Sequence, residues 1–574
     1  MPQRRTPNAN SSDDRVRRSL LRRFGRILGV AKSEASGVST DGAKSESQAS
    51  DANSSLPPSG RAAFLVAAGI MLSRIAGLIR DRSLAHFLGS TDAADAFRAA
   101  LRIPNILQNL FGEGVLSASF IPTYARLLGS DDEAEADRVA SVVGSLLAVV
   151  VSSCVILGIL VTPLLIDLIA PGFSGEKRQL TIALVQIMFP GVGALVMSAW
   201  CLGILNSHGR FFLSYTAPVA WNLCIIAGLL IFRNTGSLAQ LVVYVGWSSV
   251  VGSLAQLLVQ VPTVLRVTTR LHFSLKLASP PVQSVLHNFV PVFISRGVVQ
   301  LSAYLDSVLA SLLPSGSVAL LGYAQNIGLL PISLFGMSIS AAELPAMSRA
   351  LAGNEEQVRS ELTTRLTAAL RRMAFFVIPA AVGFIALGDT IAAMLYQTGR
   401  FTREDTFYVW ALLAGSGVGL LASTFGRLCS SAFYALRDTR TPLRFAIIRV
   451  TLTVGLGYLF AFPLPSLLHL DPKCGLPGLT ASAGIAGWVE FLLLRGSLQR
   501  RIGSFALPAS IGFRIWAAAI FAAVIVFPLK QFWVDLHPLI AGAIFLPLYG
   551  GLYAAGTLAL RIPEARLITC FWKR

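Results

Sequence analysis

The sequence has few charged residues for its length. Of 574 residues, only 14% are Asp, Glu, Lys or Arg, whereas ordinary globular proteins contain about 25%. Hydrophobic residues make up 54%, and apolar stretches of about 20 residues or more, enough to cross a hydrocarbon core, recur from Ala62 to Leu560. The shortage of charge excludes a soluble multidomain protein and indicates a polytopic integral membrane protein.

Catalytic and metal-binding motifs are also missing. The chain has no His-x-x-x-His pair, no phosphate-binding Gly-x-x-x-x-Gly-Lys loop and no Gly-x-Ser-x-Gly elbow in a strand context. Its six cysteines are scattered, without the spacing of a metal site or a disulfide framework. We therefore expect a transporter rather than an enzyme, with no metal and no cofactor. Without an ATP site, transport would draw on ion gradients, membrane potential or the substrate gradient.

The net charge of +18 does not indicate nucleic-acid binding. Eleven of the 48 Lys and Arg lie in the first 61 residues, and most of the others lie in short loops. Residues 1–60 are polar and basic, and we expect a disordered cytoplasmic tail there. The loops on the side of this tail carry roughly 23 Lys and Arg and the opposite loops about 9. This bias predicts that both termini are cytoplasmic.

The apolar pattern predicts an all-α membrane protein with about fourteen transmembrane helices. The expected spans are 62–86, 92–127, 139–168, 180–206, 212–232, 238–264, 281–313, 317–350, 363–388, 405–434, 442–463, 475–498, 510–530 and 538–560. We expect the tail at 1–60, an N-terminal lobe at 61–270, a C-terminal lobe at 271–500 and two further helices within 501–574.

An internal repeat supports the two lobes. Its first copy has Phe111-Gly112, Pro122 and Arg126, and its second has Phe335-Gly336, Pro345 and Arg349. Upstream of these, Ser73-Arg74 corresponds to Ser295-Arg296. Six crossings separate the copies, so both enter the membrane in the same direction. Parallel repeats of this kind form two six-helix lobes around a central binding site.

Charged residues inside the apolar segments indicate a functional cavity, because they are costly in a membrane. They are Arg74, Arg80, Asp81 and Arg82 in the first segment, Asp95, Arg98, Arg102 and Glu113 in the second, Arg296 and Asp306 in the seventh, Glu343 in the eighth and Arg427 in the tenth. One reading is internal ion pairing, such as Arg80 with Asp95. Arginine nevertheless exceeds carboxylate in the first lobe, which favours an anionic ligand such as a diphosphate.

Pro104 and the run Gly112-Glu113-Gly114 interrupt the second segment. Such interruptions are tolerated where a membrane helix lines a cavity or moves, so we assign these residues a conformational role. Loose packing is the alternative. Asp306 could bind a coupling cation, and an internal ion pair is the alternative for that residue.

Several sequence motifs occur in a fixed order along the chain. They are Ser73-Arg74-Ile-Ala-Gly77-x-x-Arg80-Asp81, Asp95-Ala-Phe97, Pro104-Asn105, Phe111-x-Glu113-Gly114-x-x-Ser117-x-x-Phe120-x-Pro122, Tyr396-Gln-x-Gly399-x-Phe401-Thr402 and Phe433-Tyr434-Ala-x-x-Asp438-Thr-x-Thr441-Pro442. Together they resemble the MurJ/MviN family of lipid II flippases, in the multidrug/oligosaccharidyl-lipid/polysaccharide exporter superfamily. The resemblance is collinear from about residue 61 to 560.

The resemblance implies alternating access that moves lipid II, undecaprenyl-diphosphate-linked MurNAc-pentapeptide-GlcNAc, to the outer leaflet of the bacterial plasma membrane. It implies that Arg74 and Arg80 bind the substrate headgroup, that Asp95 is the matching acidic residue and that the last two segments hold the polyprenyl tail. Membrane lipids would be partners. We expect a monomer, and the cell-wall synthesis machinery is a candidate partner.

The sequence departs from the family at three positions where the resemblance leads us to expect arginine, namely Gln108, Asn109 and Asn326. We keep Gln108, Asn326 and Arg296 among the substrate-binding candidates. Two alternatives stay open at this point. The chain could transport another lipid-linked sugar or an organic ion, or it could be a non-transporting scaffold for cell-wall enzymes.

Overall fold

The chain folds into helices that are long enough to span a membrane. The computed structural model describes residues 60–111, 113–268, 270–351, 354–533 and 536–566, and these residues contain no strand. Eleven helical stretches among them are long and apolar enough to cross a membrane. Large apolar side chains point outward, such as Leu160, which is 74% exposed, as expected for a surface in contact with lipid. The predicted all-α membrane fold is confirmed.

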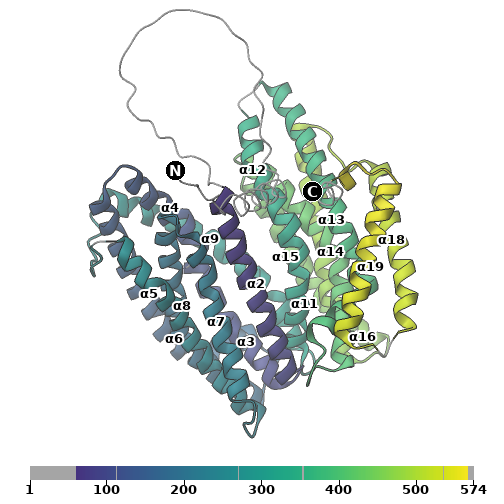
Figure 1. Ribbon diagram of the computed structural model, residues 1–574, viewed down its shortest axis with the longest axis horizontal. Helices are drawn as coiled ribbons and strands as arrows, with labels where there is room; N and C mark the ends of the chain where they lie inside the picture. The colour runs from purple at the N-terminus through teal and green to yellow at the C-terminus, as the bar shows by residue number, and fades with distance from the viewer. Residues whose placement is uncertain (1–59, 112, 269, 352–353, 534–535, 567–574) are drawn as a thin grey trace, which may run out of the picture.

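We use the name lobe 1 for the first seven helices of the described residues. They are α2 (Gly60–Leu88), α3 (Asp92–Phe111), α4 (Glu113–Gly129), α5 (Glu133–Ile169), α6 (Gly175–Ser207), α7 (Phe211–Ile231) and α8 (Leu238–Val267). Helix α7 packs against both α2 and α8, and α6 packs against α3, α5 and α8. Figure 1 shows these helices as one group on the purple-to-teal side of the molecule.

We use the name lobe 2 for the stretch of chain from α9 to α17. Its helices are α9 (Pro280–Ala303), α10 (Leu305–Ser311), α11 (Ser317–Pro331), the π-helix η1 (Ile332–Met337), α12 (Ser338–Ala350), α13 (Glu355–Tyr396), α14 (Arg403–Ala435), α15 (Arg440–Ala461), α16 (Pro463–Leu467), the 3-10 helix η2 (Pro472–Cys474) and α17 (Gly475–Ile502). Helices α14 and α17 form its centre. The chain then forms α18 (Ala509–Gln531), α19 (Pro538–Ala559) and the short η3 (Pro563–Ala565), and α18 and α19 pack on α13 (Figure 1).

Three of the fourteen predicted spans are helical but fall outside the eleven apolar ones. They correspond to α2, to α3 with α4, and to α9 with α10. The first two contain most of the intramembrane charges, such as Arg74, Asp81 and Arg98, and charge lowers hydropathy. The number fourteen therefore stays a prediction.

The second copy of the sequence repeat contains a change of helical geometry. In the first copy, the position between α3 and α4 is Gly112, which lies outside the described residues. In the second copy, η1 includes Phe335-Gly336 and directly follows Pro331. A proline lacks the N–H of the helical ladder, so a wider turn at this point has a physical cause. Pro104, by contrast, lies inside α3 without ending it.

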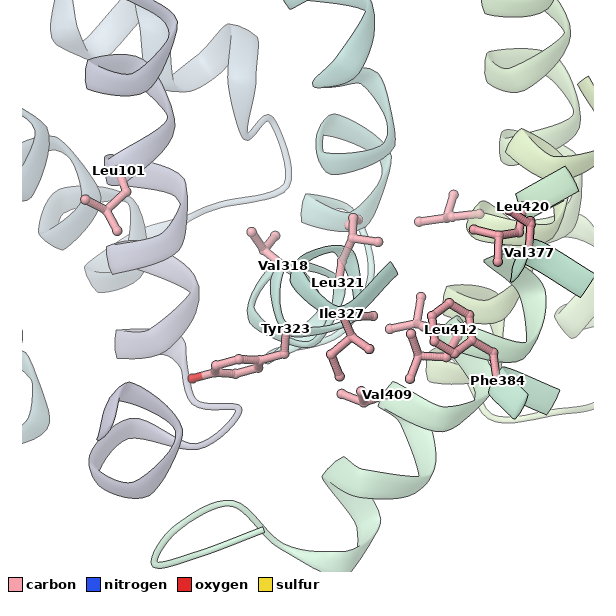
Figure 2. Packing of buried hydrophobic residues seen from close by; sticks show 14 of the residues in the cluster. Leu101, Val318, Leu321, Tyr323, Ile327, Val377, Phe384, Val409, Leu412 and Leu420 are labelled. Atoms are coloured by element: carbon pink, nitrogen blue, oxygen red, sulfur yellow. The ribbon is translucent and has the colours of Figure 1, made fainter. Parts of the chain in front are cut away.

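Helix α11 packs against its own lobe on one side and against lobe 1 on the other. Figure 2 shows Ile327 packed beside Val409 of α14, and Tyr323 pointing the other way, toward the purple helices of lobe 1. Tyr323 is 1% exposed, and its hydroxyl lies 3.5 Å from the carbonyl oxygen of Gly89. One helix therefore carries both the core of lobe 2 and its contact with lobe 1.

The segment Arg270–Ser279 joins the lobes and runs along α5. We call it the linker strand because its first residues are extended, although it is not part of a β-sheet. Backbone N–H groups of alternate residues donate to side chains that lie one helical turn apart: Arg270 to Asp137 (3.0 Å), His272 to Ser141 (3.2 Å) and Ser274 to Ser145 (3.0 Å). Four helical residues rise about 6 Å and two extended residues about 6.6 Å, so the two spacings match. This ladder fixes the linker strand to lobe 1.

We expect the double substitution Ser141→Ala with Ser145→Ala to release the linker strand. It removes the acceptors of the N–H groups of His272 and Ser274, so hydrogen exchange of the peptide that spans residues 270–276 should rise severalfold. Each serine hydroxyl also donates to the carbonyl four residues earlier in α5, and alanine leaves that helix intact. The matched control is Ser153→Ala, an exposed serine of the same helix with the same internal bond. Equal protection in both variants would contradict the ladder.

Candidate functional site

A polar cavity of about 300 Å³ lies in lobe 1 and faces lobe 2. Its lining comes from five helices and comprises Ser73, Arg74, Gly77, Arg80, Asn105, Gln108, Leu195, Pro218, Trp221, Asn222 and Gln256. Arg74 and Arg80 are the charged residues in this lining, and both belong to α2. The remaining polar groups are neutral hydroxyls, amides and an indole. The cavity therefore offers positive charge along one wall and neutral hydrogen-bonding groups on the others.

Arg74 reaches across to lobe 2. Its Nη1 donates to the hydroxyl of Ser333 in η1 over 3.1 Å. Among the described residues it forms no ion pair with a carboxylate, and its side chain is exposed. A guanidinium in this condition keeps its charge available for an anion.

Arg80 has more contacts than Arg74, and they all lie within lobe 1. It donates to Oδ1 of Asn222 (3.0 Å) and to Oδ1 of Asp81 (3.0 Å). Its guanidinium carbon also lies 5.0 Å from the centre of the Trp221 ring, which suits a cation–π contact. The indole of Trp221 is fixed in turn by a 3.1 Å bond to Ser249. This support orients Arg80 toward the cavity.

Asp81 links the two lobes beside the cavity. It is 5% exposed and accepts a 2.7 Å hydrogen bond from the amide of Asn326 in α11. Arg98 is a second cation near the same carboxylate, at 3.4 Å, and its guanidinium also lies over the Tyr323 ring. Asn326 therefore contacts Asp81 and is absent from the cavity lining, whereas Gln108 is part of it.

The contacts of Arg74 and Asp81 share one register. These residues are seven apart on α2, and their partners Ser333 and Asn326 are seven apart along α11 and η1. Seven residues are close to two helical turns, so each pair lies on a single face. Arg74 and Asp81 therefore share a face of α2, and that face looks toward lobe 2.

Asp95 lies away from the cavity lining, in the main contact between the lobes. It is 1% exposed and pairs with Lys177 of α6 at 2.6 Å. Its carboxylate also accepts from the backbone N–H groups of Gly316 (2.8 Å) and Ala319 (2.7 Å), at the start of α11. Asp95 thus caps the first turn of a helix in the other lobe. The suggested pairing of Arg80 with Asp95 is wrong, because α6 supplies the nearer cation.

We call the contact of residues 82–95 with residues 312–323 and 394–402 the seam. Arg82 donates to the carbonyl oxygens of Met394 (2.6 Å) and Leu395 (3.0 Å), in the last turn of α13. The N–H of Arg400 donates to the carbonyl of His86 over 2.9 Å. Backbone and side-chain bonds thus close the two lobes against each other at the end where α2 stops.

Asp306 has cations as its charged neighbours. It interacts electrostatically with Arg449 of α15 and with Arg102 of α3. Arg102 itself lies 5.9 Å from the ring centre of Tyr304. Within the described part of the chain, no group of three or more His, Cys, Asp and Glu could hold a metal ion. These neighbours favour the internal-pair reading of Asp306 over the cation-ligand reading.

Other predicted site residues are described incompletely. The backbone of Arg296 lies in α9 and that of Glu113 and Gly114 at the start of α4, but their side-chain surroundings lie outside the described residues, as does Gly112 altogether. The sequence reading missed Trp221, Asn222, Gln256, Ser333 and Lys177. Amides within otherwise apolar segments gave a signal for Asn222 and Gln256. No local pattern distinguishes Ser333 or Lys177.

We expect Gly399→Ala to loosen the seam. Gly399 has a φ of +56°, and an added Cβ would lie 2.4 Å from the carbonyl oxygen of His86. Alkylation of a cysteine placed at Ser317, which is 1% exposed in the seam, should become severalfold faster. The matched control is Gly503→Ala, which has a similar backbone strain at φ +99° but nothing closer than 3.8 Å to the added atom. Equal rates in the two variants would show that the seam does not depend on this close approach.

Comparisons with known proteins agree over most of the chain. A family model described as "Lipid II flippase MurJ" matches residues 84–543. A "Probable lipid II flippase MurJ" from Rhizobium meliloti (strain 1021) is 32% identical over 433 residues, 75% of this chain and 78% of that protein. One from Rhizobium tropici is 30% identical over 482 residues, 82% of this chain and 87% of that protein.

Solved structures show the same architecture. A "Lipid II flippase MurJ" in an inward closed conformation matches with a TM-score of 0.69 at 25% identity, over 87% of this chain and 99% of that one. An inward-facing multidrug resistance MATE family transporter of the MOP superfamily matches with a TM-score of 0.61 at 21% identity, over 77% of this chain and 100% of that one. The latter likeness concerns the fold alone.

Proposed function

The chain belongs to the lipid II flippase MurJ family, and on that premise we propose how it holds and moves its substrate. It is a multi-pass bacterial membrane protein, a transporter and not an enzyme, that flips lipid II across the membrane for peptidoglycan synthesis. The proposal concerns the substrate contacts, the direction of movement and the arrangement of the chain in the membrane.

We propose that the net charge at the cavity and directly behind its wall matches the diphosphate of lipid II. Arg74 and Arg80 line the cavity, and Arg98 adds a third positive charge from outside the lining. Asp81, also outside the lining, is the carboxylate that Arg80 and Arg98 share. Two positive charges remain, and a diphosphate that is esterified at both ends carries two negative charges. Arginine forks suit phosphate oxygens. The guanidinium of Arg74, which lines the cavity and pairs with no carboxylate among the described residues, is the observation that carries this assignment.

The neutral part of the same cavity suits the sugar and peptide of the substrate. Asn105, Gln108, Asn222 and Gln256 offer amides that both donate and accept hydrogen bonds. Such groups fit hydroxyls and peptide units, which carry no charge. Gln108 thus keeps its place among the substrate contacts, in a headgroup role rather than a phosphate role.

The seam belongs to the conformational cycle in this proposal. The excess of basic residues on the side of the N-terminal tail supports cytoplasmic termini, which puts the seam at the external face. Lipid II then enters from the inner leaflet while the seam is closed and leaves to the outer leaflet when it opens. Asp95 and Asn326 hold the closed state. Lobes 61–270 and 271–500 move against each other, with Pro104 inside α3 and the run Gly112-Glu113-Gly114 in a conformational role.

The proposal also covers the polyprenyl tail, Arg296, the oligomeric state and Asp306. Helices α18 and α19, within 501–574, hold the polyprenyl tail on their apolar surface, where Phe513 is 75% exposed. Arg296, the sequence counterpart of Arg74, is a further substrate contact in this proposal. The chain acts as a monomer, with the cell-wall synthesis machinery as its protein partner. Asp306 pairs with Arg449 or Arg102.

We expect Arg74→Ala and Arg80→Ala each to weaken lipid II binding about tenfold or more. A hydrogen bond to a charged group contributes about 1.5–3 kcal/mol, and each substitution removes such bonds. Both variants should also fail to replace the wild-type protein in cells depleted of it, at unchanged protein level. Arg74→Lys should be intermediate, because lysine keeps the charge but loses the fork.

The matched control is Arg233→Ala, an exposed arginine in the loop after α7, which should bind and complement normally. Full binding and growth with both Arg74→Ala and Arg80→Ala would assign these arginines to structure alone. Normal external exposure of lipid II after depletion, in cells without a second flippase, would count against the transport itself.

A further inference from the structure

The linker strand combines two kinds of side chain in alternation. Odd positions carry Leu271, Phe273, Leu275 and Leu277, and even positions carry Arg270, His272 and Lys276. Successive side chains of an extended chain point to opposite sides. The strand is therefore amphipathic, with an apolar side and a basic side.

The apolar side is not covered by the protein. Phe273 is 71% exposed, Leu275 49% and Leu277 43%, although the hydrogen-bond ladder holds the strand firmly on α5. Three adjacent large apolar side chains form a patch that a water-facing surface rarely leaves open. The basic residues Arg270 and Lys276 are exposed as well.

The position of the strand along α5 indicates what covers this patch. The ladder runs from Asp137 to Ser145, over the start of the apolar segment of α5 at 139–168, which follows the charged residues Asp137 and Arg138. One turn further, the outward face of α5 starts at Val149 and continues with Ile156 and Leu160, all exposed. The patch is therefore continuous with the lipid-facing surface of lobe 1, at the level where polar sequence gives way to apolar sequence.

We propose that the linker strand is a binding site for anionic phospholipids of the leaflet on the side where α2 begins. Phe273, Leu275 and Leu277 insert among the acyl chains, while Arg270 and Lys276 contact the headgroup phosphates. Apolar anchors with neighbouring cations are the combination that binds anionic membrane surfaces. The lipid would hold the chain segment that joins the two lobes at a fixed depth in the membrane. Because the ladder fixes this segment to α5, lobe 1 would be held at that depth as well.

The first test locates Phe273 relative to the lipid. The full chain, with Phe273 replaced by a photoreactive benzophenone amino acid, is placed in nanodiscs of phosphatidylcholine and phosphatidylglycerol and irradiated. We expect lipid adducts at a yield close to that of the same probe at Leu160, which is 74% exposed on α5. The same probe at Glu356, exposed at the start of α13, should give none. A yield at Phe273 as low as at Glu356 would overturn the proposal.

The second test concerns the charge. In the same nanodiscs, adducts at Phe273 should favour phosphatidylglycerol over phosphatidylcholine, and Arg270→Gln with Lys276→Gln should reduce that preference by about fivefold for each cation removed. The matched control is Arg233→Gln with Arg403→Gln, two exposed arginines at the opposite end of the bundle, which should change nothing. An unchanged preference in the linker variant, or an equal loss in the control, would overturn the headgroup assignment. Neither test depends on flipping activity.

Discussion

The closed arrangement of the two lobes depends on one buried carboxylate. Asp95 forms an ion pair with Lys177 of its own lobe and accepts hydrogen bonds from two backbone N–H groups in the first turn of α11. Removing a partner from a buried pair costs about 3–5 kcal/mol, so this contact is strong while it stays dry. Lys177 also pairs with Asp92, which is 60% exposed. Water therefore lies close by and can replace the two N–H groups when the lobes part, while Lys177 keeps the carboxylate paired. A contact of this kind can be both tight and reversible.

Adjacent residues of α2 serve different lobes because of helical geometry. Arg80 points to Asn222 in lobe 1, and the next residue, Asp81, points to Asn326 in lobe 2. A turn of about 100° per residue separates their directions, yet the two side chains still share an ion pair. One short segment therefore binds within its own lobe, contacts the other lobe and lines the cavity. Any movement of lobe 2 relative to Asp81 changes the surroundings of Arg80 directly.

The sequence predicted the all-α membrane fold well, because the fold follows from local periodicity. The lengths of the apolar runs and the placement of Arg74 and Arg80 in one apolar segment concern residues near each other in the chain, and both arginines line the cavity. The ion-pair partners of the charged side chains were harder to predict. Arg80 lies closer to Asp95 in sequence than Lys177 does, and only the packing of α6 against α3 brings Lys177 to it. The family resemblance pointed to Asp95 as the matching acidic residue, whereas its partners are Lys177 of α6 and the first turn of α11.

The amides at positions where family resemblance suggests arginine need not weaken an anion site. Asn326 stabilises Asp81 through a neutral donor, so it adds no positive charge to the cavity wall. The charge of the wall comes instead from Arg74 and Arg80 of α2, and Arg98 of α3 lies behind it, against the Tyr323 ring of α11. A cation carried by α11 would leave with lobe 2 whenever the lobes separate. Cations on α2 and α3 belong to one lobe, so in the proposed cycle an anionic headgroup can remain bound to that lobe while the other moves.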